Sequence, residues 1–241
     1  MDAKTALVKL FTRVLPNWRY LPRSAVRTCR ACRRTTLFLC IGEADEFKIC
    51  VRCRANLRYE MLATYLGQLN LSAARVLELD YGSPLRSCLS KAQEHIQSFY
   101  RPEVPRGALR HDGAICQDIT CLTYPTESID VIVSSDVLEH VPDAHAAFRE
   151  SARVLKPGGI HLFTVPPTNS TRPRAVVENG GIRHLTTPEY HRDPLDPRGI
   201  LAFWDFGPDI PEYFADSGLT FRVVMGPEGA DKRIVWEARK P

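Results

Sequence analysis

The sequence predicts an α/β protein in which a small four-cysteine module precedes an open, largely parallel sheet. Three observations lead to this fold class. Four cysteines form two identical short pairs within residues 29–53. From residue 75 onward, short apolar runs alternate with helical patterns, as they do in parallel-sheet domains. The 241 residues suit one medium domain with a small accessory module. We therefore expect an N-terminal segment (1–26), a cysteine module with a connecting helix (27–70) and a sheet domain (71–241).

The strands and helices of the predicted sheet domain can be taken in chain order. Buried strands are expected at 75–80, 128–135 and 159–166, and a final strand pair at 221–226 and 233–239. Helices are expected at 54–69, after Pro84, at 142–155 and at 209–218. The sequence Lys156-Pro157-Gly158-Gly159 should end the third helix, because glycine permits a left-handed turn. Residues 167–206 are expected to be a long irregular loop or lid.

The N-terminal segment combines an apolar stripe with basic residues. Residues 3–15 place Leu7, Leu10, Phe11, Val14 and Leu15 on one helical face, and Pro16 ends the pattern. Such a helix packs on its own protein or makes weak contact with a membrane surface. No apolar run reaches about 18 residues, the length that spans a bilayer. No secretory signal is evident beside Asp2, so we expect a cytoplasmic protein.

The net charge of +4 conceals an uneven distribution. Residues 1–60 hold 13 Lys and Arg against 5 Asp and Glu, and the remaining residues hold 19 against 23. A basic front of this kind suits a polyanionic partner such as RNA, an anionic lipid or a phosphorylated substrate. A solvated basic face that keeps the protein soluble explains the same charge.

The four paired cysteines have the spacing of a structural zinc site. Cys29 and Cys32 form one pair, 17 residues follow, and Cys50 and Cys53 form the second pair. Two short pairs that converge on one ion give the tetrahedral thiolate set that Zn²⁺ prefers. We expect the other cysteines to be small core residues: Cys40, Cys88, Cys116 and Cys121. Seven arginines surround the module and make it a candidate phosphate-docking surface: Arg27, Arg30, Arg33, Arg34, Arg52, Arg54 and Arg58.

Two segments in the second half resemble a known enzyme family. These are QDITCLTYPTESIDVIVSSDVLEHVPD (117–143) and RVLKPGGIHLFTVP (153–166), which resemble the fourth and fifth strands and the intervening helix of class I S-adenosylmethionine-dependent methyltransferases. The cysteine pairs and the pattern HLTTPEYHRDP (184–194) resemble a zinc-ribbon-containing subgroup. The resemblance implies a Rossmann-like seven-stranded methyltransferase sheet that binds S-adenosylmethionine.

The resemblance also implies which residues bind the cofactor. Asp118 with the Ile119 backbone would hold the adenine amine, and Glu78 would lie at the methionine end. Residues near the reactive methyl would be Ser134, Ser135 and Asp136. The glycine-rich loop departs from the family pattern, because Asp80 and Pro84 stand where glycines are usual and Gly82 remains. The ribose-binding acid after the second strand is also missing, with Glu103 the nearest acid in sequence.

Three histidines are candidate general bases for methyl transfer: His140, His184 and His191. Asp136, Glu139 and His140 also resemble the ligand set of metal-dependent methyltransferases, which would hold Mg²⁺ or Mn²⁺. The favoured function is methylation of an oxygen or nitrogen on a sugar or other small polar acceptor. Two alternatives stay open: an RNA methyltransferase that docks through the basic module, and a catalytically degenerate scaffold.

Overall fold

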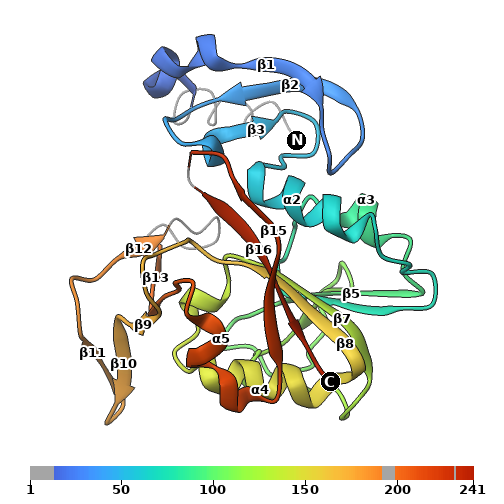
Figure 1. Cartoon of the computed structure of the whole chain (residues 1–241), viewed down its shortest axis with the longest axis vertical. Coiled ribbons are helices and arrows are strands. Elements are labelled where there is room, and N and C mark those ends of the chain that lie inside the picture. The colour runs from blue at the N-terminus through green and yellow to red at the C-terminus, as the bar shows by residue number, and fades with distance from the viewer. Residues whose placement is uncertain (1–13, 192–198, 231) are drawn as a thin grey trace.

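The computed structural model describes residues 14–191, 199–230 and 232–241 (Figure 1). The helix expected at 3–15 lies mostly outside these residues. The centre of the fold is a seven-stranded sheet of order β15-β16-β8-β7-β4-β5-β6. Its strands are β4 (Arg75–Glu78), β5 (Glu94–Phe99), β6 (Ile115–Cys116), β7 (Ile129–Ser135), β8 (Leu155–Thr164), β15 (Thr220–Glu228) and β16 (Arg233–Arg239). The predicted Rossmann-like sheet is thus confirmed.

The order of the strands reverses beside β4. This first strand pairs in parallel with both β5 and β7, so the chain leaves β4 in one direction and later returns on its other side. Ligands of open α/β sheets bind beyond the carboxyl ends of the strands at such a reversal. The predicted closing pair is also present, because β16 runs antiparallel to both β8 and β15.

Helices cover both faces of the sheet (Figure 1). On one face lie α2 (Leu57–Leu66) and α3 (Arg86–Leu89), and on the other lie α4 (Ala144–Val154) and α5 (Ile210–Tyr213). Because strand side chains alternate between faces, Val131 and Val133 pack with α2 in one apolar cluster, and Ile132 packs with α4 in another. Asp143 caps α4 by accepting a hydrogen bond from the backbone N–H of Ala146 at 2.8 Å.

The cysteine module is a three-stranded antiparallel sheet that packs against this body. It contains β1 (Ala25–Thr28), β2 (Thr35–Cys40) and β3 (Lys48–Cys50), with short 3₁₀ helices η2 (Leu15–Arg23) and η3 (Asp45–Phe47). Cys40, Cys88 and Cys116 are buried, as expected for core residues. The same expectation for Cys121 is wrong, because its side chain is exposed. The module shares its apolar cluster with α2 and the sheet: Cys29, Ala31, Phe38, Cys50 and Ala55 belong to it.

Residues 167–206 contain more regular structure than the sequence indicated. Three short antiparallel pairs form there: β9 (Arg172–Pro173) with β14 (Trp204–Asp205), β10 (Ala175–Glu178) with β11 (Gly181–His184), and β12 (Tyr190–His191) with β13 (Ile200–Leu201). Their ladders are only two to four residues long, so periodicity is too brief to detect. Short 3₁₀ helices η4 (Leu138–His140) and η5 (Ala215–Ser217) complete the described elements. Within the described residues, no helix is long and apolar enough to cross a membrane.

Candidate functional site

The four paired cysteines converge on one point. Their sulfur atoms all lie within 4.8 Å of one another, although the two pairs come from opposite ends of the module. Both pairs form the same turn: the backbone N–H of Arg33 bonds to the Cys29 carbonyl and that of Arg54 bonds to the Cys50 carbonyl, each at 2.8 Å. Arg33 and Arg54 adopt left-handed φ values of 55° and 71°. The donor set fits a tetrahedral zinc ion with no position left for a substrate.

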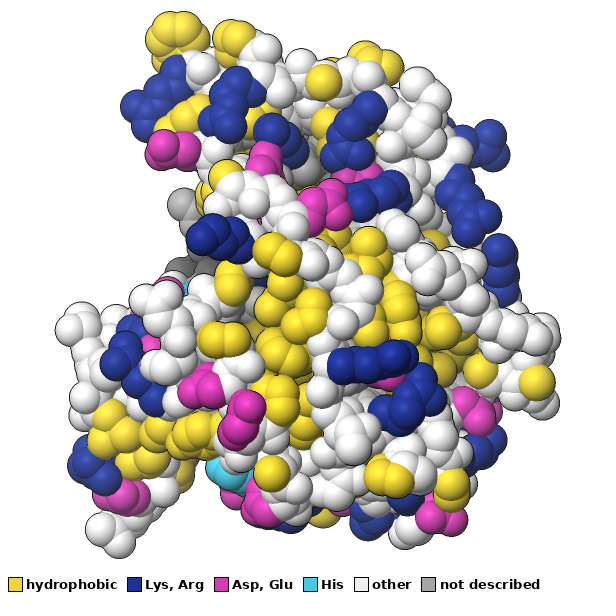
Figure 2. Space-filling model, in the orientation of Figure 1, with side chains coloured by type: hydrophobic (Ala, Val, Ile, Leu, Met, Phe, Trp, Pro, Cys, Tyr) yellow, Lys and Arg dark blue, Asp and Glu magenta, His cyan; other side chains and the backbone are white. Residues whose placement is uncertain are grey.

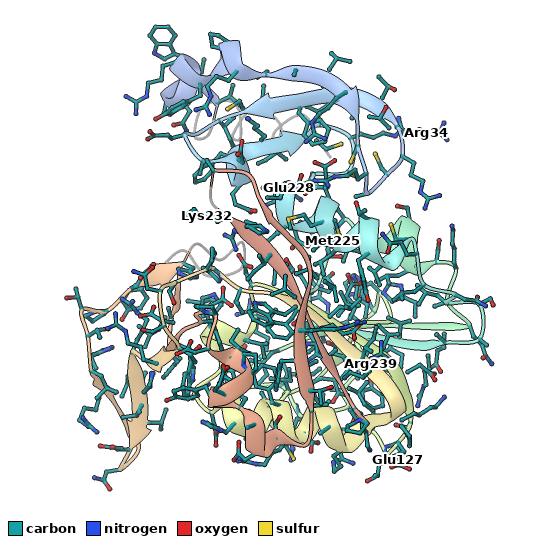
Figure 3. All side chains as sticks on the ribbon, in the orientation of Figure 1. Arg34, Glu127, Met225, Glu228, Lys232 and Arg239 are labelled. Atoms are coloured by element: carbon teal, nitrogen blue, oxygen red, sulfur yellow. The ribbon has the colours of Figure 1, made fainter. Side chains whose placement is uncertain are left out.

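The arginines around the module divide into two groups. Arg27 donates to the buried Glu60 of α2, with Nη1 2.9 Å from Oε1, and Arg30 pairs with Glu228 at the tip of the β15–β16 hairpin at 2.7 Å (Figure 3). Arg58 points into the sheet domain. Within the described residues, the other four are exposed and form no ion pair: Arg33, Arg34, Arg52 and Arg54. Figure 2 shows basic side chains along this part of the surface.

At the carboxyl end of β4, two carboxylates lie close to the altered glycine loop. Glu78 is fully buried, accepts a hydrogen bond from Ser83 and lies 2.8 Å from His95 Nε2. Asp80 accepts a hydrogen bond from the Tyr59 hydroxyl. Burial, aided by the neighbouring charge of Glu78, raises the pKa of Asp80 to about 7 against the lowering effect of the Tyr59 hydrogen bond. Gly82 has a φ of 76° and an open surrounding, so the loop keeps the one left-handed position that needs glycine.

At the carboxyl end of β7, Ser135 and Asp136 meet two arginines. Arg58 Nε donates to Ser135 Oγ at 3.0 Å, and Arg58 Nη1 lies 3.2 Å from an Asp136 oxygen. Arg233 of β16 donates to the same carboxylate at 3.0 Å. Tyr59, Arg58 and Arg233 were not among the residues expected at this edge. In the sequence, Arg58 and Tyr59 look like ordinary residues of a predicted helix, and Arg233 looks like a charge on the protein surface.

The remaining residues assigned to the cofactor lie apart from this cluster. The Ser134 hydroxyl lies on the opposite side of β7 and is 2.9 Å from Nε2 of the buried His161. Burial lowers the pKa of His161 to about 3, so this histidine is a neutral core residue. Asp118 accepts hydrogen bonds from the N–H and hydroxyl of Thr120 at 2.9 and 2.7 Å, and Ile119 is buried in the core.

Two of the three candidate bases come together around a buried carboxylate. Glu139 is 1% exposed, and among the described residues neither of its side-chain oxygens has a hydrogen-bond partner of ordinary geometry. His191 Nδ1 lies 3.7 Å from Glu139 Oε1, His140 Nε2 lies 3.8 Å from it, and the two imidazole rings are 4.9 Å apart. His140 Nδ1 is 2.9 Å from the Leu201 carbonyl, which orients its ring. His184 lies exposed on β11, outside this cluster.

The electrostatics of this cluster favour proton transfer near neutral pH. Burial raises the pKa of Glu139 to about 7. The contact with Glu139 raises the pKa of His191 above its ordinary value, against the opposing effect of burial. A buried carboxylate without hydrogen bonds is costly unless a cation compensates it. Protonated His191 can supply that charge, and so can a divalent ion held by Glu139, His140 and His191.

Comparison with known proteins identifies the sheet domain. Residues 61–163 match the family model described as a methyltransferase domain. A ubiquinone biosynthesis O-methyltransferase of Coxiella burnetii is 41% identical over 49 residues, which cover 20% of this chain and 21% of that protein. A protein of Mycolicibacterium smegmatis named "Probable S-adenosylmethionine-dependent methyltransferase" is 34% identical over 94 residues, which cover 39% and 30%.

The alignments thus span about a fifth to a third of the length of these curated relatives. Among solved structures, an S-adenosylmethionine-dependent methyltransferase from Mesorhizobium loti aligns with a TM-score of 0.47 at 18% identity, over 71% of this chain and 93% of that one. The matched residues include β4, β7, α4 and most of β8, whereas Arg58, His191 and Arg233 lie outside the match. Residues 61–163 of this chain therefore match a methyltransferase domain, and they form the centre of its seven-stranded Rossmann-like sheet.

Proposed function

We propose that this protein transfers a methyl group from S-adenosylmethionine to a hydroxyl group of a small polar acceptor, with sugars among the candidates. The observation that carries the proposal is Glu139, whose buried carboxylate lies between two imidazoles just beyond β7. Methylation of a hydroxyl requires removal of its proton, and a histidine backed by a carboxylate is suited to that task. The names of the curated relatives, which include O-methyltransferases, agree with an oxygen acceptor.

In this proposal His191 is the general base. Its ring is 28% exposed, whereas Glu139 is 1% exposed, so the imidazole is the group that an acceptor can reach. The acceptor O–H bond breaks as its proton moves to His191. The acceptor oxygen would bond to the methyl carbon as the methyl–sulfur bond of the cofactor breaks, with S-adenosylhomocysteine as the leaving group. Glu139 stabilises the imidazolium that results. The cofactor supplies the electrophilic methyl group when it is bound.

The carboxyl ends of β4 and β7 fit the zwitterionic cofactor. Glu78 and Asp80 offer carboxylates for its cationic part, and Arg58 holds Ser135 beside them. We assign Glu78, Asp80, Gly82, Ser135 and Asp136 to this site by position. Asp118 and Ile119 remain assigned to the adenine end by family resemblance. For Ser134 we propose a supporting role, because its hydroxyl contacts His161.

We further propose that the four cysteines hold one structural zinc ion. The support is the convergence of the four sulfur atoms and the identical turns at both pairs. Zinc bound there would stabilise the module, since all four coordination positions are occupied by thiolates.

The cofactor assignment can be tested by calorimetry with S-adenosylmethionine and S-adenosylhomocysteine. Binding of either is expected. If neither binds at millimolar concentration, the enzyme proposal is wrong and the scaffold alternative is favoured.

The acceptor assignment can be tested with methyl-labelled S-adenosylmethionine and a panel of sugars, phenols and amines. Label should transfer to a hydroxyl compound, and His191→Gln should lower turnover by about a hundredfold, the lower end of general-base effects. His184→Gln is the matched control, because His184 is exposed on β11 and should leave turnover unchanged. Equal activity of both variants would exclude His191 as the base.

A divalent metal ion at Glu139, His140 and His191 is the alternative chemistry for the same site. Their ligand atoms lie within 4.8 Å of one another. Two imidazoles and one carboxylate suit transition ions better than Mg²⁺, and Asp136 is engaged by arginines rather than by this cluster. Loss of turnover in a chelator that leaves the cysteine site loaded, with recovery on adding Mn²⁺, would favour the metal over the base.

RNA methylation is the second candidate function, and the exposed arginines of the module favour it. Arg33, Arg34, Arg52 and Arg54 present four guanidinium groups to solvent. RNA binding that weakens steeply with salt would support docking through phosphates. If the protein does not bind RNA at low salt, methylation of a small acceptor is the function that remains.

A further inference from the structure

A charged network links the cysteine module to the cofactor edge. Its four members come from four elements: Glu46 from η3, Arg58 from α2, Asp136 beyond β7 and Arg233 from β16. Arg58 Nη1 lies 2.9 Å from Glu46 Oε2 and 3.2 Å from Asp136 Oδ2. Arg233 closes the ring, with Nη1 3.0 Å from Asp136 and Nε 3.5 Å from Glu46. All four side chains are at most 24% exposed.

Glu46 is the part of this network that belongs to the module. It lies between β2 and β3 and accepts hydrogen bonds from the Arg58 N–H at 3.2 Å and from the Asn56 amide at 2.6 Å. It therefore holds both the start of α2 and the guanidinium of Arg58. Arg58 and Arg233 each join Glu46 to Asp136, so these two arginines connect Glu46 with the cofactor edge.

Two consecutive residues of α2 reach two neighbouring strands. Arg58 donates to Ser135 at the end of β7, and Tyr59 donates to Asp80 at the end of β4. The first turn of the helix that follows the module thus spans the crevice in which the cofactor is proposed to bind. The next residue, Glu60, points back to the module instead and bonds to Arg27.

Asp136 depends on this network for its conformation. It has a φ of 52°, in the left-handed region that non-glycine residues rarely adopt. Its carboxylate is held by Arg58, Arg233 and the Thr164 hydroxyl, the last at 3.0 Å. Because Asp136 begins the turn that carries Glu139 and His140, its position also sets theirs.

We propose that the cysteine module is a working part of the cofactor site, in which Glu46 aims Arg58 and Arg58 positions Ser135 and Asp136 for cofactor binding. This inference rests on the proposed function. Arg58 is a positioning residue whose planar fork bonds to three partners at once, and a lysine ammonium cannot reproduce that geometry. The role of the module therefore extends beyond stabilising the fold or docking a partner.

A double-mutant cycle tests the inference, with S-adenosylhomocysteine binding measured by calorimetry on zinc-loaded protein. Arg58→Lys should weaken binding about tenfold, and Glu46→Gln about threefold. In the double variant, Glu46→Gln should add no further loss, because its effect passes through Arg58. Independent, purely structural effects would instead add.

Arg27→Lys is the matched control. Arg27 also joins the module to α2, through Glu60, but contacts no residue of the cofactor edge. Its variant should bind S-adenosylhomocysteine within about twofold of wild type, the scale of uncoupled sites. Zinc content and the unfolding midpoint are measured for every variant, so that a loss of folded protein is not mistaken for a loss of affinity.

The outcomes separate this inference from the proposed function. If wild type binds no S-adenosylhomocysteine, the proposed function fails. If wild type binds and the Glu46 and Arg58 variants bind equally well, only the present inference is overturned. It is also overturned if Arg27→Lys weakens binding as much as Glu46→Gln does. Should Arg58→Lys not fold, the comparison of Glu46→Gln with Arg27→Lys decides alone.

Discussion

The ion pair between Glu60 and Arg27 gives a quantitative test of how the cysteine module is attached. Glu60 is completely buried, and it accepts hydrogen bonds from both terminal nitrogens of Arg27 and from the Arg30 N–H. In Glu60→Gln, an amide group replaces an acceptor that faces three donors. Removing one partner of a buried pair costs about 3–5 kcal/mol. Because Arg27 is 41% exposed and can regain water, we expect the lower end, about 3 kcal/mol.

For a chain of this size, 1 kcal/mol shifts the unfolding midpoint by about 2–4 °C, so Glu60→Gln should lower it by about 6–12 °C. Circular dichroism on zinc-loaded protein measures the midpoint. The control is Glu178→Gln, whose carboxylate pairs with Arg183 on the exposed β10–β11 hairpin, with side chains 49% and 58% exposed. That variant should melt with wild type. Equal midpoints for the two variants would refute the assignment of Glu60 as the attachment of the module.

Three further predictions concern other parts of the molecule. Cys50→Ser should abolish stoichiometric zinc in purified protein, whereas Cys40→Ser should retain it; retention in both would remove the metal assignment. The pKa of Glu139 is raised to about 7, so its contribution to stability is complete below about pH 4.5, the ordinary glutamate pKa, and is lost as the pH rises through 7. The variant Glu139→Gln should therefore show a smaller decline in unfolding midpoint between pH 5 and 8 than wild type. An unchanged slope of midpoint against pH would contradict this prediction. Gly207→Ala should lower the free energy of unfolding by about 1–3 kcal/mol, because a Cβ there would lie 2.4 Å from a backbone atom of Ser170. In Gly181→Ala the nearest atom to the new Cβ is 3.8 Å away, so this control should unfold in urea like wild type.

The features that the sequence predicted correctly are those encoded within a few residues. Apolar runs of strand length identified β4, β7 and β16. The Lys-Pro-Gly-Gly segment was expected to end the helix through a glycine turn, but α4 already ends at Val154 with Leu155 in extended conformation, and the segment lies within β8. The short pairs in 167–206 escaped detection because each has too few residues for a periodic pattern. The domain boundaries at residues 26 and 70 remain predictions. The cysteine module, α2 and the sheet share one apolar cluster, so the packing does not separate them at residue 70.

The candidate site was only partly predictable. Asp80, Ser135 and Asp136 follow strands whose carboxyl ends must meet, so topology alone brought them near one another. Sequence reasoning gave the same weight to His184 and His191, yet His191 is the one beside Glu139. Their distinction depends on how β12 folds back over η4 across about 50 residues of chain, which no local pattern encodes.

By itself, the sequence determined the sheet domain, the cysteine pairs and the methyltransferase resemblance, because each depends on residue type and short-range spacing. The tertiary structure decided which charges face inward. Arg54 and Arg58 both belong to the region of the module, but Arg54 is exposed, whereas Arg58 is half-buried and pairs with Asp136. Burial is a property of the packed elements around a side chain: a guanidinium enters the protein only where carboxylates from other elements compensate the loss of water. Those carboxylates, Glu46 and Asp136, are 90 positions apart in the chain and meet only in the folded protein.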